Sequence, residues 1–298
     1  MLNFVTPELQ DREWIQEIVA GTENRGSDLA FGNIYLLRNK YDTKICRYED
    51  FFIRKYNGLW RLGYTFPIGE GDMEAALHEL EEYVAGTGEP LNFCMLTEEQ
   101  KSLLEEIYPG RFIFSCNEGD TDYVYLSEEL ANLAGRAYHK KKNHVLRFMR
   151  TYENVDLRPI TGENKEDAWT VEERWHHAHQ EQANYSQMAE RNAIWEALQN
   201  MEDLGLMGAV LYVEDVPAAM TIASRINGDT CDIHFEKVND EYAVSGGYSV
   251  INQLYARQLT DYKWINREED IGIEGLRKAK LSYHPKLFIQ KYSARSRV

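Results

Sequence analysis

Alternating apolar and polar residues dominate the first quarter of the chain. Three such runs, 44–47, 50–56 and 59–67, are separated by turn residues that include Asn57-Gly58. A period of two is typical of strands that bury one face, and Asn-Gly favours a tight turn, so the runs predict antiparallel hairpins. Ahead of them the sequence predicts an extended stretch and two helices, at 4–6, 12–20 and 29–39.

From residue 72 the apolar spacing changes to three and four, which predicts an amphipathic helix over 72–85 that ends at Gly86. A strand over 91–96 follows, and the next helix, 97–108, begins with the capping box Thr97-Glu98-Glu99-Gln100. A pair of strands at 111–115 and 121–126 completes this first set of elements.

A second set follows in the same order. Helices are predicted over 136–152, 164–179, 191–200, 247–260 and 273–282, and strands over 156–160, 207–213, 218–225, 230–237, 264–265 and 287–292. No long linker rich in Gly, Ser or Pro separates the two sets, and 298 residues exceed the usual size of one domain. We therefore expect two closely packed domains, 1–130 and 131–298.

Composition narrows the class of protein. Hydrophobic residues make up 43% of the chain and charged residues 28%, as in ordinary globular proteins. The first residues carry no secretory signal, and the longest apolar run, 204–213, is far shorter than the roughly 20 residues that cross a bilayer. We expect a cytoplasmic protein with no transmembrane segment. The four cysteines form no CxxC pair, which argues against a structural zinc site or a disulfide framework.

The net charge of -16 opposes any general attraction to polyanions. One helix is an exception, because basic residues recur on one of its faces at steps of three and four. These residues, with Asn143 among them and Lys141 and Lys142 on the flanks, are Arg136, Lys140, Arg147 and Arg150. The face is either simply solvated or able to steer a polyanion, and both interpretations stay open.

A glycine turn opens the helix predicted at 247–260. Its residues, Ser245-Gly246-Gly247-Tyr248, would place free backbone N–H groups at a helix start, which suits a phosphate or a developing oxyanion. The alternative is that the glycines only shape the start of the helix.

Histidines and acids give two further possibilities. His176, His177 and His179 lack the His-Glu-x-x-His pattern, so we expect no metal site there. His234 and Glu236 lie two apart on a predicted strand and would share one face as an acid/base pair, unless His234 is a core residue.

The C-terminal segment concentrates opposite charges. Arg277 and Lys280 stand three apart on a helix and would hold a phosphate or carboxylate together. Asn266, Glu268 and Asp270 alternate along an extended stretch, where the acids would suit an ammonium group. A structural network of ion pairs is the alternative.

This segment, 264–272 followed by 275–285, resembles the C-terminal signature of the phosphatidylglycerol lysyltransferase C-terminal domain family. The resemblance extends to Gly135, Phe148 and the residues 141–143, 234–237 and 246–248. It implies an α/β fold with mixed sheets, in two tandem acyl-CoA N-acyltransferase-like (GNAT) domains packed together, of which only the second binds ligand. It also implies relatives that move an aminoacyl group from tRNA to a lipid or peptidoglycan acceptor. Two departures are Ala243, where such folds carry Arg or Gln before the donor turn, and the missing membrane-embedded half.

The resemblance and the residues together predict an acyl or aminoacyl transferase. The donor would be acyl-CoA or aminoacyl-tRNA, the acceptor an amine or hydroxyl of a small molecule, lipid or peptide, and no cofactor would be tightly bound. Glu236, Glu268 and Asp270 are the candidate catalytic groups. The candidate binding residues are Lys141, Lys142, Asn143, His234, Gly246, Gly247, Tyr248, Asn266, Arg277, Lys280 and Tyr283. One alternative is a non-catalytic ligand-binding module with the same fold. Another is a structural or interaction protein, which a cleft filled by side chains would favour.

Overall fold

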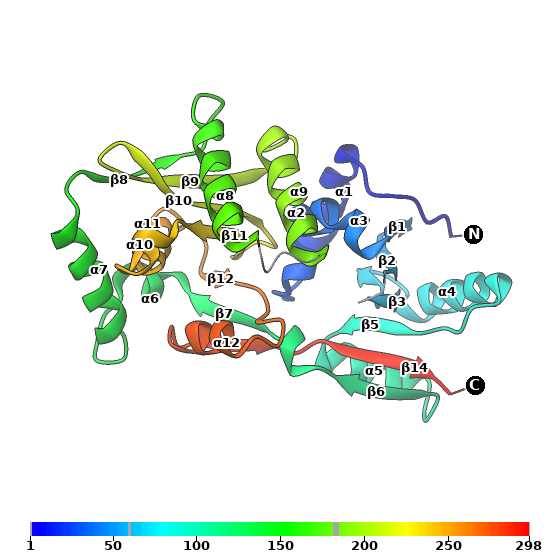
Figure 1. Ribbon diagram of the computed structural model, residues 1–298. Coiled ribbons are helices and arrows are strands. Elements are labelled where there is room, and N and C mark those ends of the chain that lie inside the picture. The colour runs from blue at the N-terminus through cyan, green and yellow to red at the C-terminus, as the bar shows by residue number, and fades with distance from the viewer. Residues whose placement is uncertain (1, 59–60, 181–184, 298) are drawn as a thin grey trace.

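The computed structural model describes residues 2–58, 61–180 and 185–297. They form two lobes side by side, each built on a seven-stranded mixed sheet, and both ends of the chain lie at the first lobe (Figure 1). Within the described residues, each sheet has one parallel pair of strands, β3 with β5 in the first and β11 with β12 in the second. The mixed α/β architecture predicted from the sequence is therefore confirmed.

The first sheet has the order β1-β2-β3-β5-β14-β6, and β4 pairs with β2. Its strands are β1 Thr43–Tyr48, β2 Phe51–Asn57, β3 Leu62–Tyr64, β4 Ile68–Gly69, β5 Phe93–Leu96, β6 Phe112–Cys116 and β14 Tyr292–Ser296. The second sheet has the order β13-β7-β12-β11-β10-β9-β8. Its strands are β7 Asp122–Leu126, β8 Val155–Pro159, β9 Leu206–Val213, β10 Val216–Arg225, β11 Thr230–Val238, β12 Trp264–Asn266 and β13 Leu287–Ile289.

Helices cover both sheets. Those of the N-terminal part are α1 Arg12–Ala20, α2 Phe31–Leu36, α3 Arg38–Tyr41, α4 Met73–Thr87, α5 Glu98–Ile107 and α6 Ser127–Asn132, with short 3₁₀ turns at Leu9–Asp11, Ser27–Leu29 and Glu118–Asp120. Those that follow are α7 His139–Thr151, α8 Lys165–His179, α9 Tyr185–Gln199, α10 Asp240–Ala243, α11 Gly247–Ala256 and α12 Glu274–Leu281. None of these described helices combines the length and apolar character that a bilayer crossing requires.

Three apolar cores hold the lobes together. One lies between the second sheet and α1, α2, α8 and α9, and it also takes in Phe52 of the first sheet. A second packs α6, α7 and α11 on the opposite face of the second sheet. The third joins the first sheet to α4 and α5. Because the first core contains residues of both sheets, the lobes are packed against one another as expected.

The two sheets exchange strands. The prediction that 111–115 and 121–126 pair with each other is wrong, because β6 pairs with β14 and β7 pairs with β12 and β13. The single strand predicted at 287–292 is also wrong, since β13 belongs to the second sheet and β14 to the first. The buried Lys291 lies between them, and its contacts with acids hold the chain where it crosses. A cut at residue 130 consequently does not separate the two sheets.

Local signals were mostly accurate. The Thr97 capping box is present in full. The helix predicted to end at Gly86 continues to Thr87, and Gly88, at φ 73°, ends it in the left-handed conformation that glycine adopts easily. The basic helix starts at His139 rather than at 136.

Candidate functional site

The two parallel strands at the centre of the second sheet separate partway along their length. β11 pairs with β12 only from Thr230 to Asp232, opposite Trp264 to Asn266. Beyond that point β11 continues to Val238, whereas Arg267 and Glu268 bond through their backbones to Tyr123 at the start of β7. This opening between β11 and the segment after β12, which we call the splay, leaves sheet backbone without its neighbour on one side. In open α/β sheets, ligands commonly bind in a crevice outside the carboxyl ends of the strands.

Two ion pairs bridge the splay. Arg267 Nη2 lies 2.9 Å from Glu236 Oε1, and His234 Nδ1 lies 3.6 Å from Glu268 Oε1. They lie on opposite faces of the sheet, because the β10–β11 register shifts between Ile222 and Ala223 and this bulge breaks the alternation of β11. The predicted pairing of His234 with Glu236 is therefore wrong, since an unbroken strand was assumed.

Glu236 and Arg267 lie on the face that α7 and α11 cover. Arg267 stacks over the ring of Tyr283, 5.0 Å from its centroid, and Lys141 Nζ of α7 lies 3.9 Å from the same ring. Burial and the nearby Arg267 lower the pKa of Lys141 to about 8. The Tyr283 hydroxyl lies 3.3 Å from Ser249 Oγ at the start of α11. The site thus combines one carboxylate, two cations and a phenol.

The surroundings of this pair leave it partly open. The side chains of Glu236 and Arg267 are 11% and 15% exposed, and Tyr248 beside them is an exposed aromatic residue. Partial burial and the charge of Glu236 raise the pKa of Tyr248 to about 12, so it stays a neutral phenol. Lys142 and Asn143 are exposed on α7, where Asn143 contacts His139.

Arg277 and Lys280 do not act together as predicted. Arg277 donates two hydrogen bonds to the carboxylate of Asp270, from Nε to Oδ2 at 2.6 Å and from Nη2 to Oδ1 at 3.2 Å. Asp270 is fully buried and also accepts hydrogen bonds from the Tyr123 hydroxyl and from Gly272 N–H. A carboxylate with four donors is a structural group, which matches the ion-pair alternative for these two residues rather than catalysis.

Lys280 lies on the same helix as Arg277, α12, but its side chain reaches the backbone of Arg267 instead of Asp270. Its Nζ donates a hydrogen bond to the backbone carbonyl of Arg267, and burial together with Arg267 lowers the pKa of Lys280 to about 8. Tyr125 donates to the Lys280 carbonyl, which ties α12 to β7. Lys280 therefore fixes the backbone position of Arg267 instead of pairing with Arg277.

The glycine turn is packed against α7. An added Cβ on Gly246 would lie 3.0 Å from the His144 carbonyl oxygen, and one on Gly247 would lie 2.7 Å from Val238 Cγ1. Arg147 donates to the carbonyls of Val244 and Ser245. These contacts explain both glycines by close packing at the start of α11. Binding of a donor to the turn's N–H groups stays a prediction.

The other face of the splay carries a fully buried group. His234, 2% exposed, lies 3.1 Å from Asp232 Oδ2 through Nδ1 and 2.8 Å from Ser224 Oγ through Nε2. Glu268 Oε1 accepts a hydrogen bond from Asn33 Nδ2 of α2. Burial alone would lower the pKa of His234, but Asp232 and Glu268 outweigh it and raise the pKa to about 9. The sequence reasoning missed Asp232, although its spacing of two from His234 was visible.

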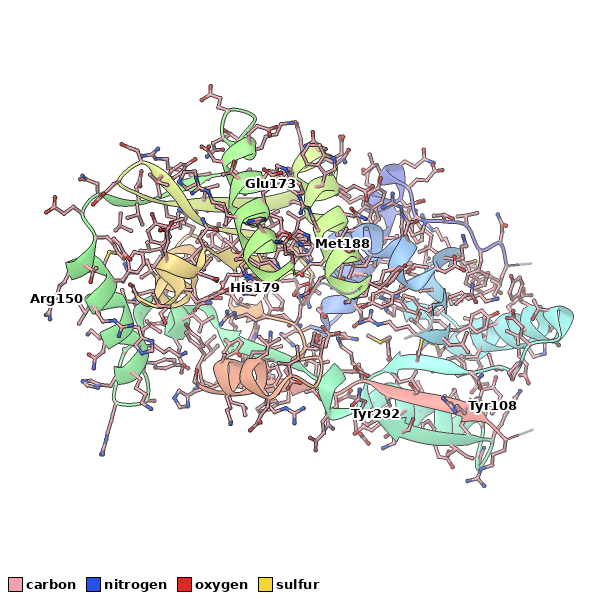
Figure 2. All side chains as sticks on the ribbon, viewed as in Figure 1. Tyr108, Arg150, Glu173, His179, Met188 and Tyr292 are labelled. Carbon is pink, nitrogen blue, oxygen red and sulfur yellow. The ribbon has the colours of Figure 1, made fainter. Side chains whose placement is uncertain are left out.

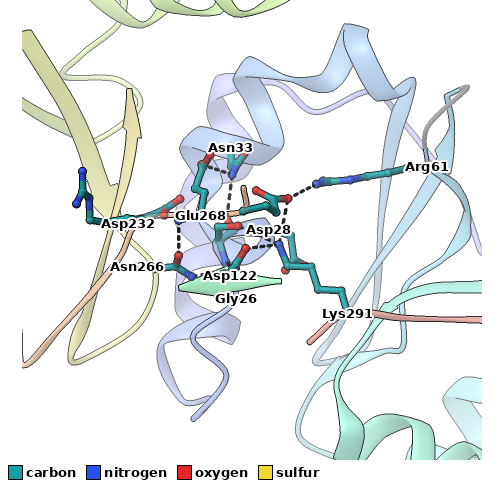
Figure 3. Close-up of polar contacts among 12 residues, drawn as sticks. Gly26, Asp28, Asn33, Arg61, Asp122, Asp232, Asn266, Glu268 and Lys291 are labelled. Carbon is teal, nitrogen blue, oxygen red and sulfur yellow. Dashed lines mark hydrogen bonds and ion pairs between the residues drawn. The ribbon is translucent and has the colours of Figure 1, made fainter. Parts of the chain in front are cut away.

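A buried network of charges continues from this group into the space between the lobes (Figure 3). Asn266 contacts Asp122, which pairs with Lys291, and Lys291 and Arg61 both contact Glu269. Asp28 pairs with the buried Arg54 at 2.6 Å. Burial works to raise the pKa of Asp28, but Arg54 and Lys291 prevail and lower it. Side chains therefore fill this contact between the lobes, and nothing in the sequence pattern signalled Asp28, Arg61 or Lys291.

Two surface hollows lie away from these charges. One, of about 560 Å³, is lined by residues of β8, β9 and α11, among them Ile160, Met201 and Tyr255. The other, of about 600 Å³, lies between the lobes near Phe66 and Phe288. Neither contains a predicted site residue, so the chemistry of the splay and not the size of a hollow defines the candidate site.

The fold places the chain among tandem GNAT-like proteins. A tandem GNAT protein from the clavulanic acid biosynthesis pathway aligns over 100% of this chain and 99% of its own, with a TM-score of 0.50 and 10% identity. The L-PGS structure from Bacillus licheniformis aligns over 98% and 92%, with a TM-score of 0.67 and 14% identity. A conserved protein of unknown function from Bacteroides thetaiotaomicron aligns over 100% of both chains, with a TM-score of 0.94 and 35% identity.

Residues 19–295 match the family described as "Phosphatidylglycerol lysyltransferase, C-terminal". The chain belongs to this family, so the resemblance noted in its C-terminal segment is confirmed, and family and fold are those of transferases. An uncharacterised protein, MYCGA3080 of Mycoplasmoides gallisepticum, is 26% identical over 180 residues, which are 59% of this chain. The match spans 56% of that relative's length.

Proposed function

We propose that this chain transfers an acyl or aminoacyl group from a thioester or ester donor to an amine or hydroxyl, at the splay beside Glu236 and Arg267. The observation that carries the proposal is this partly exposed ion pair, placed where β11 and β12 part in a GNAT-like sheet. Small molecules, lipids and peptides all offer such acceptors. The donors that suit the fold are acyl-CoA and aminoacyl-tRNA, both of which carry phosphates.

The reaction assigns a role to each side chain. The acceptor's nitrogen or oxygen attacks the donor carbonyl, and Glu236 takes the proton that the acceptor loses. Arg267 lies 2.9 Å from Glu236 and supplies a fixed positive charge to the tetrahedral oxyanion. When the donor's C–S or C–O bond breaks, the proton on Glu236 passes to the leaving sulfur or oxygen. Burial works against the charge of Arg267, but Glu236 raises its pKa, so it stays a cation.

The basic helix would bring the donor to this place. Its exposed residues include Lys140, Arg147 and Arg150, with Arg136 exposed just before it, and Figure 2 shows Arg150 at the outer edge of the second lobe. Lys141 connects this face to the site, because its Nζ lies over Tyr283 beside Arg267. A phosphate chain lying along α7 would therefore point its acyl end at the splay. Association driven by these charges weakens as salt rises.

A binding series tests the donor. The protein is titrated with acetyl-CoA, coenzyme A, charged tRNA and uncharged tRNA at two salt concentrations, and the shift of the melting temperature is measured, because binding to the folded state stabilises it. Saturable stabilisation by coenzyme A supports a small-molecule acyltransferase. Stabilisation only by charged tRNA, which weakens with salt, supports aminoacyl transfer.

A matched pair of variants tests the site. Glu236→Gln should keep donor affinity within about twofold and slow transfer by about 10²- to 10⁴-fold, as loss of a general base does. Glu241→Gln, at an exposed position of the short helix α10 after β11, is the control and should transfer at the wild-type rate. Wild-type transfer by Glu236→Gln would remove Glu236 from the reaction.

One observation favours a second candidate, a non-catalytic module. The residue before the donor turn, Ala243, lacks the side chain that GNAT-like donor sites carry. No stabilisation by any of the four ligands would favour this module over the transferase.

A further inference from the structure

Three ligand-type side chains meet on the buried face of the splay. Asp232 Oδ2 and Glu268 Oε1 lie 3.1 and 3.6 Å from His234 Nδ1, and the ligand atoms of all three residues lie within 4.8 Å of one another. Two atoms bound to one zinc ion at about 2.1 Å in a tetrahedral arrangement lie roughly 3.4 Å apart. The two distances from His234 Nδ1 lie on either side of this value, so the group has the spacing of ligands around one small cation.

The hydrogen bonding of the group points the same way. Among the described residues, neither oxygen of Asp232 accepts a hydrogen bond and His234 Nδ1 makes none, although Asp232 is fully buried. A buried carboxylate without donors is costly, and such groups are ordinarily paired or bound to a metal. The nearby charges add to this, because Glu268 and Asp122, the other acids that act on Asp232, are both negative. These acids outnumber the one imidazole of the group, so its charge favours a bound cation.

Outer contacts hold two of the three side chains in a binding orientation. Ser224 Oγ lies 2.8 Å from His234 Nε2, which leaves Nδ1 as the nitrogen that faces the carboxylates. Asn33 Nδ2 donates to Glu268 Oε1 at 2.9 Å. Metal-binding histidines and carboxylates are usually fixed by such second contacts. Gly32 permits the close approach of α2, since an added Cβ there would lie 2.8 Å from His234 Nε2.

We propose that Asp232, His234 and Glu268 bind one divalent first-row cation, such as Zn²⁺ or Mn²⁺, which ties β11 to the segment after β12. One imidazole and two carboxylates form a ligand set that suits these ions better than Mg²⁺. The cation would lie on the opposite face from Glu236 and Arg267 and would fix the width of the splay. The proposal is independent of the transfer reaction, and it concerns different histidines from the exposed group on α8.

Metal content and affinity test the proposal. The whole protein is stripped with a chelator, loaded separately with Zn²⁺, Mn²⁺ and Mg²⁺, passed through gel filtration and analysed for bound metal. We expect one equivalent of Zn²⁺ or Mn²⁺, and a rise in melting temperature on loading. Asp232→Asn and Glu268→Gln should weaken binding by at least about 100-fold, and Ser224→Ala by about 10- to 100-fold.

The histidines of α8 provide the control. His176 and His179 can take up zinc adventitiously, so the double variant His176→Ala/His179→Ala should keep the full equivalent. If Asp232→Asn keeps its bound metal while the α8 variant loses it, the proposal is overturned. It is also overturned if none of the three loadings leaves metal bound to the protein. Because a buried variant can fail to fold, Co²⁺ loading of the wild-type protein gives a second measurement. Visible bands of a nitrogen-and-oxygen site are expected, and a spectrum of free hexaaquo Co²⁺ would also overturn the assignment.

Discussion

Lys291 Nζ lies 2.6 Å from Asp122 Oδ1, and the two residues mark the places where the chain crosses between the sheets in opposite directions. Asp122 begins β7 of the second sheet, and Lys291 directly precedes β14 of the first. Both are almost completely buried, and Ser27 donates its backbone N–H to Asp122 as well. This ion pair therefore joins the two strand exchanges that make the lobes one unit.

Replacing Lys291 should destabilise the whole protein. Lys291→Met leaves Asp122 buried without its cation and Glu269 with Arg61 alone, and loss of one partner of a buried pair costs about 3 to 5 kcal/mol. Urea unfolding followed by circular dichroism measures the change. Lys286→Met, which removes a half-exposed partner of Glu129, is the control and should cost less than about 1 kcal/mol. Equal losses in both variants would mean that the crossing is not held by Lys291.

Glu172 should make stability fall between pH 4.5 and 7. Burial raises the pKa of this α8 carboxyl to about 7, although Lys237 opposes the shift. In the unfolded chain the Glu172 carboxyl loses its proton at a lower pH than in the folded chain. The contribution of this carboxyl to the free energy of unfolding is therefore full below pH 4.5 and is lost as the pH rises to 7. Glu172→Gln should remove a loss on the order of 2 kcal/mol over this window. Unfolding curves at pH 4.5 and 7.5 measure it.

Its exposed neighbour is the control for this pH dependence. Glu173 lies 3.7 Å from Arg191 with more than half of its side chain exposed, so Glu173→Gln should keep the wild-type dependence on pH. If Glu172→Gln and the wild-type protein change in parallel across the window, the pKa of Glu172 is the same in the folded and unfolded chain and burial does not raise it.

A side chain at Gly247 should harm the fold rather than the donor site. The added carbon of Gly247→Val would meet Val238 and the Tyr242 carbonyl oxygen, which lies 2.9 Å from the Cβ position. Overpacking of this kind costs about 1 to 3 kcal/mol, measured by thermal unfolding without ligand. Gly275→Ala in α12 is the control, because nothing lies within 4 Å of its Cβ position, and it should stabilise slightly. If Gly247→Val is as stable as the wild-type protein but binds no donor, the turn takes part in donor binding after all.

Arg277 should prove structural. Arg277→Met removes both guanidinium contacts of Asp270 and should lower the melting temperature, because that carboxylate is fully buried. Donor affinity should stay unchanged, since Arg277 faces Asp270 and not the splay. Calorimetric titration of the folded variant measures this. A tenfold weaker donor would show that Arg277 also reaches the phosphate.

The sequence by itself determined the elements and the class of fold. Periods of two and of three to four placed nearly every strand and helix, because burying one face of an element requires that spacing. The Thr97 box and the exposed basic face of α7 also follow from local sequence. The C-terminal signature indicated the family, and it contains Glu268 and Lys280.

Only the tertiary structure decided which of these groups meet. The β10–β11 bulge sends His234 and Glu236 to opposite faces, and one extra residue on a strand changes no hydrophobic pattern that a sequence shows. The exchange of β7 and β14 depends on contacts between residues 169 positions apart, Asp122 and Lys291. Those contacts contribute only when both lobes are folded, because a buried ion pair is stabilised by surroundings that no local stretch of chain provides.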